Sequence, residues 1–188
     1  MNGTGRIQVA RKVVGVGSVG TRAWVLLMDT LNGVEPLFLQ AKEAQPSVLA
    51  EYCGRSQYAN QGERVVTGQH LMQAQSDIFL GWTRARGDDG VDRDSYLRQL
   101  RDWKFSAPIE QMIPEGMTFY ARMCGWTLAR AHARSGDRVA LAAYLGGSNA
   151  FDEAIADFAE TYADQNERDY AAFQAAVDDG TAQATTEI

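Results

Sequence analysis

The segment that decides the fold is Gly15-Val16-Gly17-Ser18-Val19-Gly20, which fits the pattern G-x-G-x-x-G. Successive glycines allow backbone N–H groups to approach phosphate oxygens, because no Cβ atom blocks the way. Two unrelated folds use this pattern, a dinucleotide-binding fold and a kinase-like fold. A glycine-rich hairpin that binds no ligand also fits it, so the flanking residues have to distinguish the three interpretations.

A dinucleotide-binding fold would place a helix directly after the segment. Four apolar residues there do lie at helical spacing, namely Trp24, Leu27, Met28 and Leu31. Glu43 then stands about where the acid that binds a ribose is expected. This interpretation therefore stays open.

A kinase-like fold would instead place the segment between two antiparallel strands, with a lysine on the third strand. We predict the two strands over residues 7–14 and 21–28 and the third over residues 37–42. Lys42 ends this third strand, where its ammonium group would bind phosphate oxygens. The strand before the glycine segment carries polar residues on both faces, whereas a central strand of a doubly wound sheet is apolar throughout. The sequence thus favours the kinase-like interpretation.

The phosphate-binding lysine of a kinase is held by a glutamate from the following helix. That helix is predicted over residues 63–75, and Glu63 is the only acid in it. Glu63 is therefore the candidate partner of Lys42, with Glu43 and Glu51 in reserve.

The rest of the chain predicts a change from strands to helices. A short strand over residues 78–82, a polar turn at 87–90 and a hairpin partner over 95–100 come first. Helical spacing of apolar residues then predicts three helices. The first ends near Ser135-Gly136, and the second spans residues 139–145 with Asp137 as its candidate cap. The third is long, is capped by Ser148 and continues past Tyr170 with or without a kink. Strands followed by helices indicate an α+β fold.

We accordingly expect a small antiparallel sheet with a glycine-loop hairpin and one packed helix, followed by a mainly helical part. The expected division is residues 1–104 for the sheet part and 105–188 for the helical part.

Composition excludes some classes of protein. The chain has 188 residues, 45% of them hydrophobic, and a formal net charge of −6. The negative charge argues against a nucleic-acid-binding surface. No apolar run is long enough for a membrane helix and no signal-peptide core is visible, which predicts a cytoplasmic protein. The two cysteines and two histidines show no metal-ligand spacing, so we expect no metal held by the protein alone.

Six stretches resemble the C-terminal half of a bacterial family known only as domain of unknown function 2252. They are residues 11–22, 36–49, 68–82, 96–104, 124–137 and 162–165. The resemblance implies an N-terminal half with two further motifs, similar to the catalytic loop and the metal-binding aspartate segment of aminoglycoside phosphotransferases. In this family they would precede the glycine segment, which implies a circularly permuted kinase-like fold. Residues 126–133 resemble the helix that leads into the catalytic loop of small-molecule kinases.

This chain departs from that pattern at several positions. It contains neither the catalytic-loop motif nor the metal-binding segment, so the catalytic residues are unknown and whether the chain is an enzyme stays open. Arg22 stands where protein kinases have an adenine-contacting valine, and Gln40 where they have a small alanine. Both positions bear on adenine specificity.

Together these observations predict the nucleotide-phosphate-binding half of a kinase-like phosphotransferase, incomplete by itself. The expected cofactors are ATP and Mg²⁺, and the expected partners are a nucleotide and a chain or domain that supplies the catalytic half; a homo-oligomer is a further possibility. The alternatives are a non-catalytic interaction module of the same fold and a dinucleotide-binding protein. The candidate cofactor-binding residues are Gly15, Gly17, Ser18, Gly20, Lys42 and Glu63.

Overall fold

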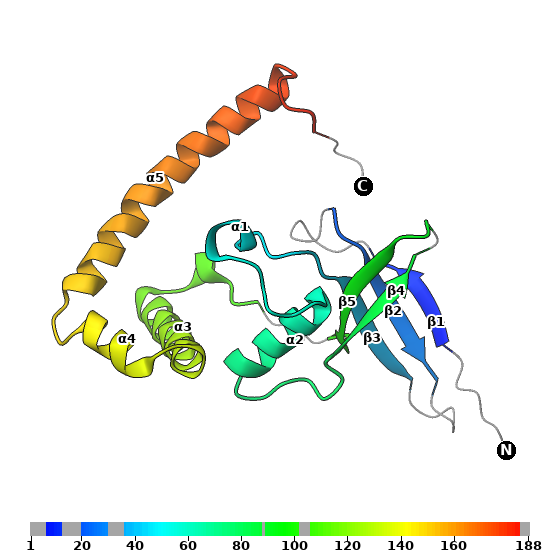
Figure 1. Ribbon diagram of the computed structural model, residues 1–188. Helices are drawn as coiled ribbons and strands as arrows, with labels where there is room; N and C mark the ends of the chain where they lie inside the picture. Colours follow the sequence, from blue (N-terminus) through cyan, green and yellow to red (C-terminus); the bar gives the residue numbers. More distant parts are fainter. Residues whose placement is uncertain (1–6, 13–19, 30–35, 88, 102–105, 185–188) are drawn as a thin grey trace. The chain divides into compact units, whose positions relative to one another are not determined.

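The first half of the chain contains a five-stranded antiparallel sheet (Figure 1). The computed structural model describes residues 7–12, 20–29, 36–87, 89–101 and 106–184. The strands stand in the order β1-β2-β3-β5-β4. Their bounds are β1 Ile7–Arg11, β2 Ala23–Met28, β3 Leu37–Glu43, β4 Gly81–Arg86 and β5 Asp92–Gln99.

The centre of the sheet is buried. Leu39, Gln40 and Ala41 of β3 are all buried, because β3 lies between β2 and β5. The two edge strands differ: all five residues of β1 are exposed, as are five of the six in β4. This exposure agrees with the polar residues that β1 carries.

The hairpin between β4 and β5 closes at the predicted polar turn. The backbone N–H of Gly87 donates to the carbonyl of Val91 at 2.9 Å, and Gly90 has a φ of +75°. A strand was expected to begin at Ile78, but β4 begins at Gly81. Asp77 accounts for the difference, because its side chain accepts the N–H of Phe79 at 2.9 Å and so stabilises a local turn there.

The chain between β3 and β4 contains a helix that packs on this sheet. After the short α1 (Ala50–Cys53), α2 spans Gln61–Met72. Its N-terminus is capped by Asn60, whose side chain accepts the N–H of Glu63 at 3.1 Å. The helix therefore starts two residues earlier than predicted, and it ends at Met72 because Gln73 is already extended.

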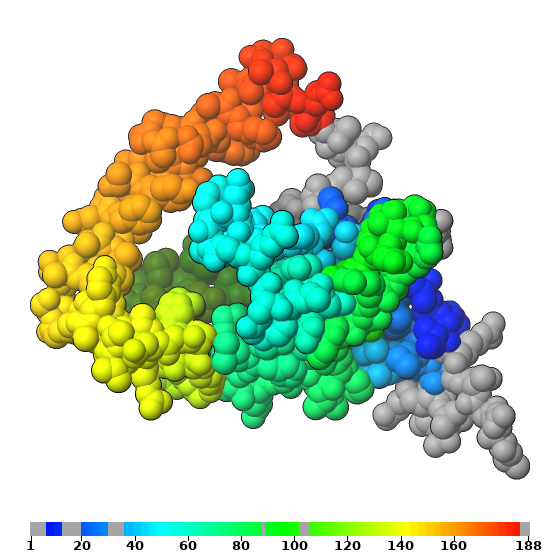
Figure 2. Space-filling view, in the orientation of Figure 1, coloured from blue at the N-terminus to red at the C-terminus, as the bar shows by residue number. Residues whose placement is uncertain are grey.

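Helix α2 covers one side of the sheet at β4 and β5 (Figure 1). Val66, on its inner side, is 1% exposed. In the space-filling view the atoms of α2 lie beside the sheet, and the tip of the β4–β5 hairpin extends beyond them (Figure 2). The sheet thus has one side covered by α2, called here the α2 side, and an opposite side.

The chain divides into two compact units, residues 1–136 and 137–188. The first unit also contains a 3₁₀ turn at Ile109–Gln111 and α3, Pro114–Ser135, which packs against α2. Arg134 of α3 donates a hydrogen bond to the carbonyl of Met72 at 3.2 Å.

The second unit contains α4, Arg138–Leu145, and α5, Ala150–Asp178. The predicted cap Asp137 is confirmed, since its carboxylate accepts the N–H groups of the first two residues after Arg138. The predicted cap Ser148 is wrong: the N-cap of α5 is Asn149, and α5 runs on to Asp178 as one helix. The five strands come before α3, α4 and α5, while α1 and α2 lie between β3 and β4, so the predicted α+β class is confirmed. Among the helices that the structure describes, none is long and apolar enough to cross a bilayer.

Candidate functional site

Most of the glycine segment lies outside the described residues. Gly15, Gly17 and Ser18 are in that part, whereas Gly20 is described and has a φ of +81°. An L-amino acid rarely adopts this conformation, and nothing lies within 4 Å of the position that a Cβ atom would occupy. Glycine is thus required at this position by the backbone angle and not by lack of space.

Backbone hydrogen bonds hold both ends of the segment. On the β1 side the N–H of Lys12 donates to the carbonyl of Ala23 at 2.8 Å. On the β2 side the N–H of Glu43 donates to the carbonyl of Arg22 at 2.8 Å. The segment therefore connects two antiparallel strands, and its second end lies beside the end of β3.

Lys42 lies on this end of β3, between Ala23 of β2 and Tyr96 of β5 in the strand register. It is half-buried. Side chains alternate along a strand, so Lys42 shares a side of the sheet with Tyr96 and with Asp94, two residues before it. The Asp94 side chain accepts a hydrogen bond from the first residue of α2, so Asp94 and Lys42 both lie on the α2 side.

The start of α2 is fixed by a carboxylate on β5. Asp94 accepts the N–H of Gln61 at 2.7 Å and the side-chain amide of Asn60 at 3.1 Å. Arg84, opposite it on β4, donates to the same carboxylate at 2.6 Å and 3.1 Å and also to the carbonyl of Ala59. These contacts bring the first turn of α2, which includes Glu63, to the side of the sheet that carries Lys42.

This environment lowers the pKa of Asp94. The hydrogen bond from Arg84 is the largest cause, and the N–H of Gln61 acts in the same direction, while burial opposes them. The same pair raises the pKa of Arg84. Asp94 is therefore an ionised anchor for α2.

A buried amide lies next to Lys42 on the α2 side. Gln40, two residues earlier on β3, is 3% exposed, and its side-chain oxygen accepts two hydrogen bonds from Arg98 at 3.3 and 3.4 Å. Position 40 thus holds a polar side chain whose orientation is fixed by Arg98.

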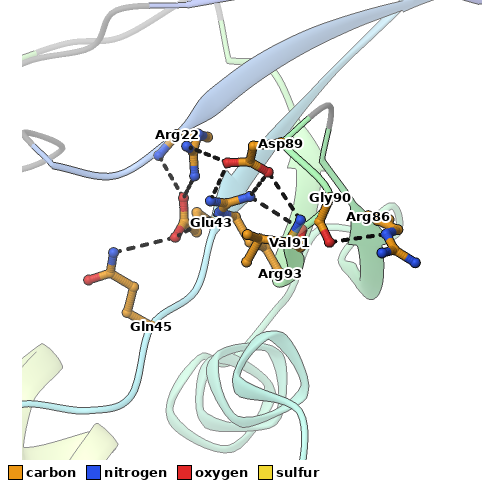
Figure 3. Close-up of polar contacts among 8 residues, drawn as sticks. All are labelled: Arg22, Glu43, Gln45, Arg86, Asp89, Gly90, Val91 and Arg93. Carbon is orange, nitrogen blue, oxygen red and sulfur yellow. Dashed lines mark hydrogen bonds and ion pairs between the residues drawn. The ribbon is translucent and has the colours of Figure 1, made fainter.

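The opposite side of the sheet carries a set of four charged residues, called here the ion network: Arg22, Glu43, Asp89 and Arg93 (Figure 3). Glu43 accepts the backbone N–H of Arg22 at 3.2 Å, and its carboxylate lies 3.7 Å from the Arg22 guanidinium and 3.9 Å from that of Arg93. Gln45 donates to its other oxygen at 3.4 Å. Glu43, a reserve candidate for the partner of Lys42, thus binds these residues on the side of the sheet away from Lys42. The other reserve candidate, Glu51, is exposed on α1.

Asp89, in the turn between β4 and β5, completes the ion network. Arg93 binds it through two parallel hydrogen bonds of 2.7 Å, and Arg22 donates to it at 3.2 Å. The hydrogen bonds from Arg93, and then that from the N–H of Val91, hold the pKa of Asp89 far below its usual range. The pKa of Arg93 is raised mainly by the same hydrogen bonds.

The ion network borders an open hollow of about 620 Å³ on the same side. Its floor is apolar and includes Val9, Trp24, Leu26, Ala41 and Leu97. A second hollow, of about 550 Å³, lies between the β3–α2 connection and α2 and is lined by residues such as Pro46, Tyr58 and Arg64. Neither Lys42 nor Glu63 lines either of these two hollows.

The sequence predictions missed both carboxylate anchors, Asp94 and Asp89. One signal was present: Arg84 and Arg86 alternate just after the predicted strand 78–82, and Asp92 and Asp94 alternate just before its predicted hairpin partner 95–100. Opposite charges at period two on paired strands indicate cross-strand ion pairs. Within the described ranges, no group of three or more His, Cys, Asp or Glu residues is arranged to hold a metal ion.

Residues 6–176 match the family model described as "Uncharacterized protein conserved in bacteria (DUF2252)". Comparison with curated proteins and with solved structures finds no match. The family match covers most of the 188 residues, both the sheet and the helical part. The chain therefore belongs to the DUF2252 family of uncharacterized bacterial proteins.

Proposed function

We propose that this chain binds the phosphates of a Mg²⁺-nucleotide between its glycine segment and Lys42, as one half of a kinase-like phosphotransferase. One observation carries the proposal. The segment connects two antiparallel strands, Lys42 lies on the third strand, and one packed helix follows before the fourth. In kinases a glycine-rich loop covers the phosphates, and the lysine of the third strand pairs with a glutamate of the following helix.

The same observation favours this proposal over dinucleotide binding. A dinucleotide-binding fold requires a helix directly after the glycine segment, since the pyrophosphate lies at that helix's N-terminus. Residues 23–28 are the strand β2, paired on both sides. Glu43, the candidate ribose ligand, is already bound by Arg22 and Arg93.

The proposed roles follow from position. Backbone N–H groups of the glycine segment would bind phosphate oxygens, and the ammonium group of Lys42 would neutralise part of their charge. Glu63 would hold that ammonium group from the first turn of α2. The protein ligands of Mg²⁺ would come from a catalytic half in another chain or domain, because this sequence lacks the metal-binding motif.

Calorimetric titration with ATP and Mg²⁺ tests the proposal. We expect weak to moderate binding without phosphotransfer, and a loss of roughly 10- to 100-fold in affinity for Lys42→Ala, the range of a charge-assisted hydrogen bond. Glu63→Gln should lose less. Arg168→Gln is the matched control, because it removes an exposed cation on α5 that contacts Gln165.

The outcomes separate the proposal from its main alternative. A wild-type chain that binds no nucleotide would point to a non-catalytic interaction module of the same fold. Binding that survives in Lys42→Ala would show that the phosphates lie elsewhere. Turnover of ATP by the purified chain would mean that its catalytic residues are not those of the kinase pattern.

A further inference from the structure

The ion network joins three parts of the protein that are distant in sequence. Arg22 follows the glycine segment, Glu43 is the residue after Lys42, and Asp89 with Arg93 belongs to the β4–β5 hairpin (Figure 3). In the sheet order, β3 and β5 separate β2 from β4, so the backbone ladder does not require a contact between Arg22 and Asp89. The contact exists because the hairpin turn reaches back to the end of the glycine segment.

Arg22 is held at four points. Its carbonyl and its N–H bind the backbone and the side chain of Glu43, at 2.8 and 3.2 Å. Its guanidinium lies 3.7 Å from Glu43 and 3.2 Å from Asp89. Arg22 stands two residues after Gly20, so these contacts fix the place where the glycine segment enters β2.

The second arginine orients the two acids. Arg93 is largely covered, with 18% of its side chain exposed, and it binds Asp89 through both oxygens while lying 3.9 Å from Glu43. The side chain of Glu43 is 11% exposed. Two arginines and two carboxylates thus form a charge-balanced set with Glu43 at its covered centre, which distinguishes it from isolated pairs at the surface.

We propose that the ion network is a positioning device for the C-terminal end of the glycine segment, at Gly20 and the two residues that follow it. Glu43 and Asp89, acting through Arg22, hold the C-terminal end of that segment beside the strand that carries Lys42. For its effect on ligands this inference rests on the proposed function, because it sets the relative position of the segment and the lysine. Neither acid would touch the nucleotide; both are positioning residues.

Amide hydrogen exchange of the full chain tests the device without any ligand. We expect Glu43→Gln and Asp89→Asn to speed exchange in the peptide over residues 20–24 by roughly two- to tenfold, while α2 stays unchanged. Asp89→Glu should restore most of the protection, because it keeps the carboxylate. The matched control is Asp169→Asn, which removes an exposed carboxylate on α5 that accepts from Gln165.

The ionic character of the device has its own test. In the wild-type chain, 0.5 M salt should raise exchange at residues 20–24 toward the rate of the variants, because the side chains of Arg22 and Asp89 are 37% and 44% exposed and salt screens exposed charges. Unchanged exchange in both Glu43→Gln and Asp89→Asn overturns the inference. Faster exchange throughout the sheet also overturns it, since the acids would then be general stability residues.

Titration with ATP and Mg²⁺ connects the device to binding. A threefold or greater loss of affinity in Asp89→Asn, with recovery in Asp89→Glu, supports the positioning role. Affinity that is unchanged in a variant with faster exchange overturns its relevance to the ligand. If the wild-type chain binds no nucleotide, the proposed function fails, and the exchange data alone decide whether the network holds the segment.

Discussion

The carboxylate of Asp94, on β5, accepts a hydrogen bond of 2.7 Å from the backbone N–H of Gln61, the first residue of α2. Thirty-three positions separate the two residues in the sequence. A helix leaves its first N–H groups without intrahelical partners, and this strand side chain satisfies one of them. The contact fixes where α2 begins relative to the sheet, and with it the place of Glu63 opposite the strand of Lys42.

Asp94→Ala should lower the free energy of unfolding by about 1–3 kcal/mol, because several hydrogen bonds to a largely buried carboxylate are lost. Chemical denaturation measures it. Asp92→Ala is the control: this residue is exposed and lies on the same side of β5. Equal stabilities of the two variants would contradict the anchoring role of Asp94.

The stability that Asp94 contributes should depend on pH. Its pKa is lowered in the folded state below the ordinary value of 3.8, chiefly by Arg84. The folded state therefore binds this proton less readily than the unfolded state, so the contribution is complete above about pH 5 and is lost as the pH falls through 3.8 toward the folded pKa. Denaturation curves between pH 3 and pH 7 should show a steeper loss for the wild-type chain than for Asp94→Ala. Parallel profiles would count against this linkage.

Gly62→Ala should destabilise the protein although alanine is the better helix former. A Cβ atom at Gly62 would collide with the carbonyl group of Ser95 on β5, so α2 would have to move off the sheet. We expect a net loss of about 1–3 kcal/mol, typical of overpacking. Gly68→Ala, in the same helix but with nothing within 4 Å, should instead gain up to about 1 kcal/mol. Thermal unfolding of the two variants decides it, and a shift in the same direction for both would refute the close contact.

The second unit should associate through α5. Six apolar residues of this helix have exposures between 36% and 63%, which leaves an uncovered apolar stripe: Phe151, Ile155, Phe158, Tyr162, Tyr170 and Phe173. Surfaces of this kind mark association sites. Light scattering after size-exclusion chromatography should find oligomers for the wild-type chain and mainly monomers for an Ile155→Gln, Phe158→Gln double variant. Glu160→Gln, off the stripe, should behave as the wild type; a monomeric wild-type chain would contradict the prediction.

Local pattern was enough to predict most elements. Alternation and turn residues placed β1 to β3 and the β4–β5 turn, and helical spacing placed α3 to α5, because these signals depend on neighbours within a few residues. The errors were local too. Asp77 turns the chain where a strand was expected, and Asn149 takes the capping position assigned to Ser148. At Asp77 a short polar side chain decided the boundary, which hydrophobic periodicity does not register. The side chain of Asn149 makes no capping hydrogen bond.

The sequence by itself determined the order of strands and helices, the glycine segment, the lysine on the third strand and the acid in the following helix. Only the tertiary structure decided which charges meet. Glu43 follows Lys42 directly, yet the pleat turns it to the opposite side of the sheet, where it binds Arg22 and Arg93. Arg22 meets Asp89 across 67 positions because the hairpin folds back toward the end of the glycine segment. Such contacts depend on strand order and register, which arise from packing of the whole sheet, so no short stretch of sequence contains them.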